Sequence, residues 1–132
     1  MKAVVTALVL FLIVISFLGV NYFVLNNFFE RTDQALALLP TAADELENMT
    51  EAELVTISER LEHIRGDWET YQTYICLSLE HTVSREFFTD FLPAIAYFDA
   101  GEYPDFLAQI KKAKDTLEHL IFDESLRLGN VL

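Results

Sequence analysis

Three histidines are the residues with the clearest capacity for chemistry, because acidic side chains lie close to each of them in the sequence. His63 follows Glu59 by four residues and His119 precedes Asp123 by four, so each pair would share one face of a helix. An imidazole and a carboxylate placed in this way can be metal ligands. Di-iron sites in helical bundles, however, take a Glu-x-x-His motif from each of two helices. The sequence has no such motif, no His-Glu-x-x-His and no cysteine cluster. We therefore expect a solvated acidic face with incidental histidines, and neither a metal ion nor another cofactor.

The serines, the glycines and the only cysteine give no sign of catalysis. No serine lies in a Gly-x-Ser-x-Gly elbow, which would expose its hydroxyl on a sharp turn, and the four glycines form no phosphate-binding loop. Cys76 lies among apolar positions with helical spacing, which is typical of a small core residue. A single cysteine also excludes an internal disulfide. We expect no enzyme activity and no catalytic residue.

The charge of the chain limits the partners that it can have. After Lys2 there are 8 Lys or Arg against 21 Asp or Glu, a balance of −13. Binding to nucleic acid needs basic clusters that neutralise phosphates, and the only such cluster is Lys111, Lys112 and Lys114. The acidic balance argues against nucleic acid and against spreading on anionic lipid.

The first part of the chain, residues 1–26, is predicted to be a transmembrane helix. Residues 3–29 carry no charge, and most of Ala3 to Leu25 is aliphatic or aromatic. At about 1.5 Å per residue, that segment reaches about 34 Å, enough to cross a hydrocarbon core of about 30 Å. A cleaved signal peptide has a shorter apolar region followed by an Ala-x-Ala-like site, and neither feature is present. These differences favour a retained signal anchor in contact with the lipid bilayer.

The flanks of this helix predict its orientation. Lys2 precedes it, and basic residues prefer the cytoplasmic side of a membrane. We therefore expect a cytoplasmic N-terminus in the cell membrane and an extracytoplasmic domain over residues 27–132. Four aromatic residues at the far end of the helix are expected at the headgroup level, namely Tyr22, Phe23, Phe28 and Phe29.

Helical signals dominate residues 27–132. A first helix is expected to continue from the membrane span, with a kink or break near Leu39 because Pro40 follows. Thr50 and Glu53 form a capping box that starts the next helix. Its apolar seam alternates steps of three and four residues: Leu54, Ile57, Leu61, Ile64, Trp68, Tyr71 and Ile75.

The seam then continues through Leu79, Val83, Phe87, Phe91, Ile95 and Phe98. This segment is either one long kinked helix or two helices that meet near residues 78–84. A turn is expected at residues 99–101, and Pro104 suits the first turn of a last helix. The buried stripe of that helix is Phe106, Ile110, Ala113, Leu117, Leu120 and Ile121. The predicted fold is all-α: an N-terminal transmembrane helix followed by an antiparallel bundle of three to four helices.

Two features could mark a surface that binds a partner. Trp68 lies on a seam, so a core anchor is the favoured interpretation and an interface hot spot is the alternative. At the other end, apolar residues follow the last stripe without keeping its spacing: Leu126, Leu128, Val131 and Leu132. This segment is either a docking tail or a cap folded onto the end of the bundle.

The order of several motifs resembles the family called domain of unknown function 4363. The resemblance rests on Trp68, Glu80-His81, the turn at residues 99–101, the Leu-Glu-His-Leu of residues 117–120 with His119, then Glu124, Leu128, Asn130, Val131 and Leu132. It implies a small bacterial protein with a membrane helix and a helical remainder, without known activity. Members are often encoded beside a multi-spanning membrane protein, which implies an accessory role. In this sequence Thr82-Val83-Ser84-Arg85 follow His81, where the family commonly has acidic residues.

Two functions of different classes follow. The first is a membrane-anchored interaction protein whose acidic domain docks on a membrane or envelope partner. Its candidate residues are Trp68, His81, His119, Glu124, Asn130, Val131 and Leu132. The alternative is an extracytoplasmic domain that senses a ligand or a metal ion.

Overall fold

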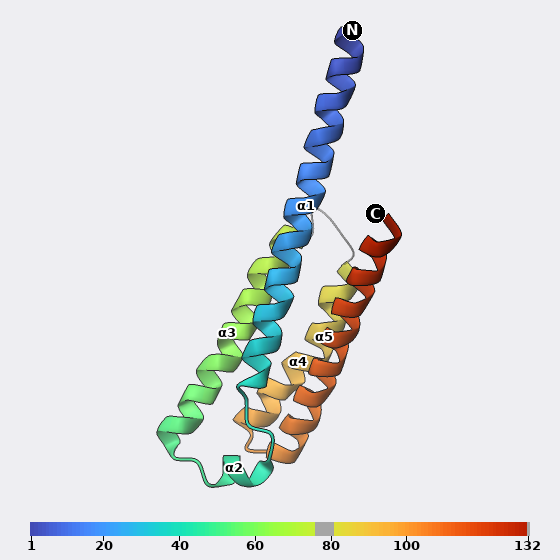
Figure 1. Cartoon of the computed structure of the whole chain (residues 1–132). Helices are drawn as coiled ribbons and strands as arrows, with labels where there is room; N and C mark the ends of the chain where they lie inside the picture. Colours follow the sequence, from blue (N-terminus) through green and yellow to red (C-terminus); the bar gives the residue numbers. More distant parts are fainter. Residues whose placement is uncertain (76–80, 132) are drawn as a thin grey trace. The chain divides into compact units, whose positions relative to one another are not determined.

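The computed structural model describes the backbone of residues 1–75 and 81–131 and the side chains of residues 1–72 and 85–122. Every regular element in these ranges is a helix, which confirms the all-α class. The helices are α1 (Lys2–Ala37), α2 (Ala43–Glu47), α3 (Glu51–Ile75), α4 (His81–Asp99) and α5 (Tyr103–Val131), as Figure 1 shows. The chain divides into two compact units, Met1–Arg31 and Thr32–Leu132.

Helix α1 ends where the sequence predicts a break. Its last residue is Ala37, and the Leu39 N–H bonds to the Leu36 carbonyl at 3.1 Å in a tighter final turn. Leu39 precedes Pro40, and the proline ring disfavours the helical conformation for the residue before it. The short helix α2 follows, with Leu46 as its buried residue. The predicted break near Leu39 is therefore confirmed.

The capping box at the start of α3 is also confirmed. The Thr50 N–H donates to Glu53 Oε2 at 2.8 Å, and the Glu53 N–H donates to Thr50 Oγ1 at 3.3 Å. Each side chain thus satisfies a backbone donor that the first turn of the helix leaves free. Most of the predicted seam of α3 is buried, namely Ile57, Leu61, Ile64, Trp68 and Tyr71. Leu54 is half-buried.

The turn between α4 and α5 depends on a glycine. Gly101 has a φ of 75°, the left-handed conformation that residues with a Cβ adopt at a cost. The Glu102 N–H bonds to the Tyr97 carbonyl at 2.9 Å, and the Gly101 N–H bonds to the Phe98 carbonyl at 3.1 Å. This is the Schellman arrangement that closes a helix. The predicted turn is confirmed, and Pro104 lies in the first turn of α5.

Helices α4 and α5 bury one stripe each. The buried residues of α4 are Phe87, Phe91, Ala94 and Phe98, so Ala94 takes the core position predicted for Ile95, which is half-buried. The stripe of α5 is buried as predicted at Phe106, Ile110, Ala113, Leu117 and Leu120, while Ile121 is half-buried. Seam positions Ile75, Leu79 and Val83 lie outside the described side chains. Whether one kinked helix joins α3 to α4 depends on residues 76–80, which lie outside the described residues.

The core of Thr32–Leu132 lies between these stripes. Helix α5 packs along α4, α4 packs against α3, and α2 packs against α5. Aromatic rings connect the layers: Phe98 of α4 lies 5.2 Å from Phe106 of α5, measured between ring centroids. Large apolar side chains fill this core, and burying each one contributes about 1.5–3 kcal/mol to folding.

Candidate membrane segment and interaction residues

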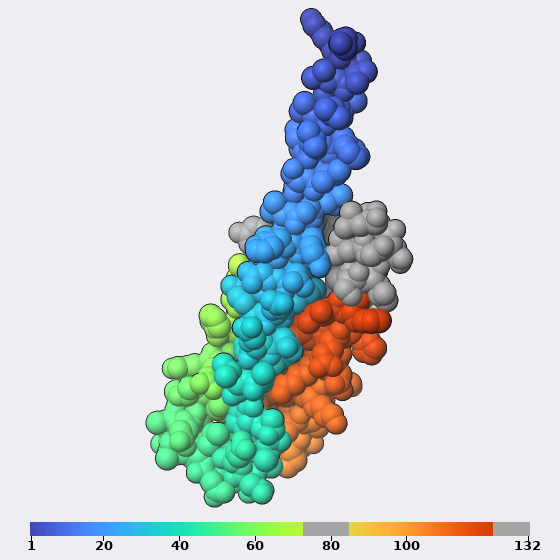
Figure 2. All heavy atoms as spheres, viewed as in Figure 1, coloured from blue at the N-terminus to red at the C-terminus, as the bar shows by residue number. Residues whose placement is uncertain are grey.

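The first unit exposes an apolar helical surface. All residues from Met1 to Val20 are exposed, and the large side chains of Phe11 and Phe17 are more than half exposed. Figure 2 draws the atoms of this segment in blue. Among the described residues, one helix, α1, is long and apolar enough to cross a membrane, and none of its most apolar window is buried. A core helix of a soluble protein would have this surface covered. Exposing it to water costs about 25 cal/mol per Å² of apolar area.

The four aromatic residues predicted at the headgroup level differ in their exposure. Phe28 and Phe29 are buried within the protein, at 4% and 1% exposure, with their ring centroids 6.1 Å apart. Tyr22 and Phe23 are exposed. Phe28, Thr32 and Leu36 follow one another at spacings of four residues, so they share one buried stripe of α1. The position of the four aromatic residues at the headgroup level stays a prediction.

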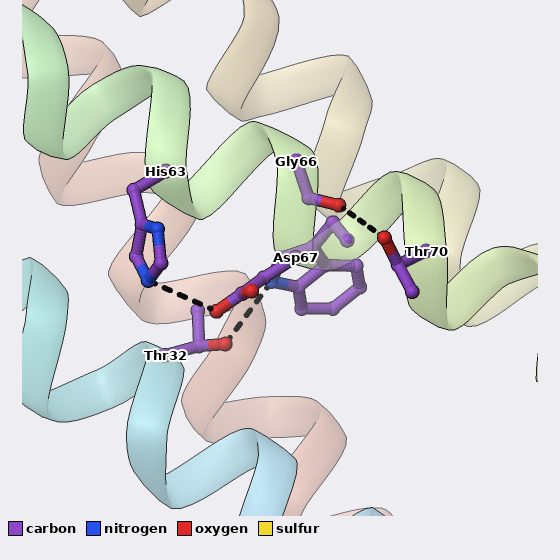
Figure 3. Close-up of polar contacts among 6 residues, drawn as sticks. Thr32, His63, Gly66, Asp67 and Thr70 are labelled. Atoms are coloured by element: carbon purple, nitrogen blue, oxygen red, sulfur yellow. Dashed lines mark hydrogen bonds and ion pairs between the residues drawn. The ribbon is translucent and has the colours of Figure 1, made fainter.

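Trp68 lies at the centre of the core of the second unit. Its side chain has no exposed surface, and its ring stacks on Phe87 with centroids 4.0 Å apart. Tyr71 and Phe88 meet it edge-on. The indole Nε1–H donates to Thr32 Oγ1 at 3.1 Å, and Figure 3 shows this bond from α3 to the end of α1. Trp68 is therefore a core anchor with a satisfied donor, and in this conformation it offers no surface to a partner.

Thr32 is a buried polar residue that the sequence reasoning placed on an apolar stripe without a role. It is 4% exposed, and its hydroxyl accepts the indole hydrogen bond. Buried polar groups need such partners because an unsatisfied group in the core is costly. The sequence contained one signal for this bond. Thr32 interrupts an otherwise apolar stripe, and the only tryptophan of the chain, whose indole N–H needs an acceptor, lies on another stripe.

A second polar contact joins α4 to α5, and sequence reasoning missed it. Thr116 Oγ1 donates to Asp90 Oδ2 at 2.5 Å, and Lys112 Nζ lies 3.8 Å from Asp90 Oδ1. The Asp90 side chain is 13% exposed, whereas that of Lys112 is 67% exposed. Hydroxyl and ammonium together compensate the partly buried carboxylate. This contact fixes the register of α4 against α5, and the polar groups of Asp90, Thr116 and Lys112 are bonded to one another.

The described histidines are separate surface residues. His63 Nε2 lies 3.7 Å from Asp67 Oδ2, four residues later on the same helix (Figure 3). The His63 side chain is 77% exposed, and His119 is also exposed. Within the described residues, no group of three or more His, Cys, Asp or Glu side chains could hold a metal ion.

Several candidate interaction residues lie beyond the described side chains. His81 begins α4, and Glu124, Asn130 and Val131 belong to the last turns of α5, but only their backbone is described. Leu132 and Cys76 lie outside the described residues altogether. Of the seven candidates, the structure therefore places the side chains of Trp68, which is buried, and His119, which is exposed.

The geometry thus combines an exposed apolar helix with a packed helical unit whose internal polar groups bond to one another. By sequence, residues 32–132 contain 20 Asp or Glu against 7 Lys or Arg. No protein-family model, no curated protein and no solved structure matches this sequence.

Proposed function

We propose that this chain is a single-pass membrane-anchored interaction protein. One observation carries the proposal: the first part of α1 is apolar, and residues 1–20 are exposed on every face of the helix. A bilayer is the solvent in which such a helix is stable, because its backbone groups bond internally and its side chains match lipid chains. Helix α1 is retained as an anchor and makes its lipid contact within Ala3 to Leu25.

The protein is oriented with its N-terminus in the cytoplasm and Thr32–Leu132 outside the cell membrane. Lys2 supports this orientation, since cytoplasmic flanks carry the excess of basic residues. The acidic balance of −13 after Lys2 disfavours close contact between this unit and anionic headgroups. A partner protein is therefore the surface on which the unit docks.

The docking unit is an antiparallel helical bundle. Two contacts support opposite directions for α1 and α3: Thr32 of α1 meets Trp68, and the carbonyl of Leu38, the residue after α1, accepts from Arg60 Nη1 at 3.3 Å. The residue numbers rise from 32 to 38 on one side of these contacts and fall from 68 to 60 on the other, so the two segments run in opposite directions. The same reversal relates α4 to α5, where Phe98 meets Phe106 and Asp90 meets Thr116. Short connections favour antiparallel neighbours in bundles.

The role of this unit is binding without catalysis. Its internal polar groups support that role, because Thr32, Asp90 and Thr116 bond to other side chains and hold helices together. Membership of the family called domain of unknown function 4363 is part of the proposal, and it supports an accessory role beside a multi-spanning membrane protein. The proposed docking surface comprises candidate residues in the segment from His119 through Glu124 to Leu132.

The proposal is tested by purifying the full chain in a mild detergent and identifying the proteins that accompany it. A variant lacking Gly129 to Leu132 is compared with the full chain at equal yield, and Trp68 fluorescence reports whether the core remains intact. A docking surface at the end of α5 predicts an intact core and loss of the partner. Lower stability together with retained partner in the folded fraction would contradict it, since those residues would then cap the bundle.

A further inference from the structure

The polar side chains in the apolar part of α1 are Thr6, Ser16 and Asn21, and the amide of Asn21 has more hydrogen-bonding groups to satisfy than either hydroxyl. The Thr6 hydroxyl donates to the Lys2 carbonyl at 2.9 Å, so it can enter hydrocarbon with its donor occupied. The Asn21 carboxamide has two donor hydrogens and an acceptor oxygen. Among the described residues no hydrogen bond of this side chain is found, and Asn21 is the first residue of α1 that is half-buried instead of exposed. Burying an unsatisfied amide in lipid is costly, so Asn21 favours a position in contact with water or headgroups.

The segment that precedes Asn21 fits a bilayer without help from later residues. Ala3 to Val20 is a run of 18 exposed residues, and at about 1.5 Å per residue it spans about 27 Å. A typical hydrocarbon core is about 30 Å thick. The ammonium group of Lys2 can extend along its methylene chain to the opposite interface, which accommodates the small difference.

A span that continues to Leu25 fits less well. It would reach about 34 Å, so α1 would have to tilt, and the Asn21 amide would enter the hydrocarbon. The residues that follow Asn21 suit the interface instead. Tyr22 is 40% exposed and carries a phenol hydroxyl, and Phe23 is 71% exposed. Aromatic side chains with a polar tip are enriched at headgroup level.

We infer that the edge of the hydrocarbon core lies at Asn21 and Tyr22. This inference rests on the proposed membrane anchoring and specifies its partner: a bilayer with a hydrocarbon core of about 27–30 Å, crossed close to its normal. Lipid chains contact Ala3 to Val20, and residues 23–27 lie among headgroups.

The test measures the depth of spin labels on the full chain in vesicles of dioleoylphosphatidylcholine. Cys76 is replaced by alanine, and single cysteines at Leu12 or Val24 carry the label. Collisions with oxygen report hydrocarbon, and collisions with a water-soluble nickel complex report water or headgroups. The inference predicts that the nickel collision rate is several-fold higher at Val24 than at Leu12. Equal protection of both positions from nickel would place the edge beyond Leu25 and overturn the inference alone. Equal nickel access at both positions would overturn the membrane anchoring itself.

A pair of matched variants tests the part played by the Asn21 amide. Asn21→Leu should extend the hydrocarbon segment and lower the nickel collision rate at Val24 several-fold. Asn27→Leu makes the same chemical change at an exposed position beyond the edge, and should leave the rate at Val24 unchanged. An unchanged rate in Asn21→Leu, or an equal decrease in both variants, would overturn the assignment of the edge to Asn21.

Discussion

Replacing Thr32 by valine should destabilise the second unit by about 1–2 kcal/mol. The side chain keeps its shape, but Trp68 Nε1, which is fully buried, loses the acceptor at 3.1 Å. An unsatisfied buried donor costs about 1–3 kcal/mol. The extra methyl group recovers up to about 0.8 kcal/mol of apolar burial. The net effect is about 1–2 kcal/mol, equivalent to a decrease of roughly 0.5–1 M in the urea midpoint for a small domain.

The assay is urea unfolding of the full chain in a mild non-ionic detergent, followed by fluorescence. Trp68 is the only tryptophan, so its emission reports Thr32–Leu132 and not the apolar part of α1. Thr70→Val is the matched control, because that exposed threonine bonds to the Gly66 carbonyl of its own helix. It should change stability by less than about 0.5 kcal/mol. Equal midpoints for Thr32→Val and Thr70→Val would refute the energetic role of the buried hydrogen bond.

Three further pairs of substitutions test the packing of the same unit, each by the unfolding assay. Leu61→Ala and Leu117→Ala should each cost about 2–5 kcal/mol, because both side chains are at most 1% exposed, and values under about 0.5 kcal/mol would mean that the seams are misassigned. Gly66→Ala should stabilise α3 by about 0.5–1 kcal/mol, since a Cβ there meets nothing within 4 Å, whereas Gly101→Ala should destabilise by about 1–2 kcal/mol because of its φ of 75°. If Gly66→Ala and Gly101→Ala changed the free energy of unfolding in the same direction, the assigned roles of the two glycines would be wrong. Asp90→Ala should lower the free energy of unfolding by about 1–3 kcal/mol, and Lys112→Ala should lower it by less than about 0.5 kcal/mol. The reason is that the principal partner of the Asp90 carboxylate is the Thr116 hydroxyl and not the exposed Lys112 ammonium. The reverse order would show that the ion pair dominates.

Local sequence signals were sufficient to predict where several elements begin and end. Thr50 and Glu53 form the expected capping box, Pro40 follows the break after α1, and Gly101 closes α4. Each of these features depends on residues within five positions of one another, so a short stretch of sequence contains the whole cause. The apolar seam of α3 was predictable for the same reason, because its period places Leu61 and Trp68 on one face.

Pairings between helices were not predictable in this way. The partners Thr32 and Trp68 are 36 residues apart, and Asp90 and Thr116 are 26 apart. Their contacts depend on the register of neighbouring helices, which the period of a single helix does not determine. Local patterns also left choices open: a spacing of four residues allowed His63 to pair with Glu59 or Asp67, and the structure has Asp67.

Choices between adjacent positions were similarly open. Steps of three or four residues from Phe91 allowed Ala94 or Ile95 in the core, and the smaller residue is the buried one. Composition favoured Ile95 because it is larger and more apolar. Which of the two is buried depends on how closely the neighbouring helix approaches α4, and a sequence pattern does not contain that distance.

A reporter enzyme fused after Leu132 shows whether α1 anchors an external helical unit in the cell membrane. The enzyme should be one that becomes active only outside the cytoplasm, expressed in bacterial cells. We expect an active, membrane-bound fusion, because Lys2 favours a cytoplasmic N-terminus and α1 is proposed to cross the membrane once. An inactive fusion of full length, with its reporter in the cytoplasm, would contradict the orientation, and an active fusion released from the membrane would contradict the anchor.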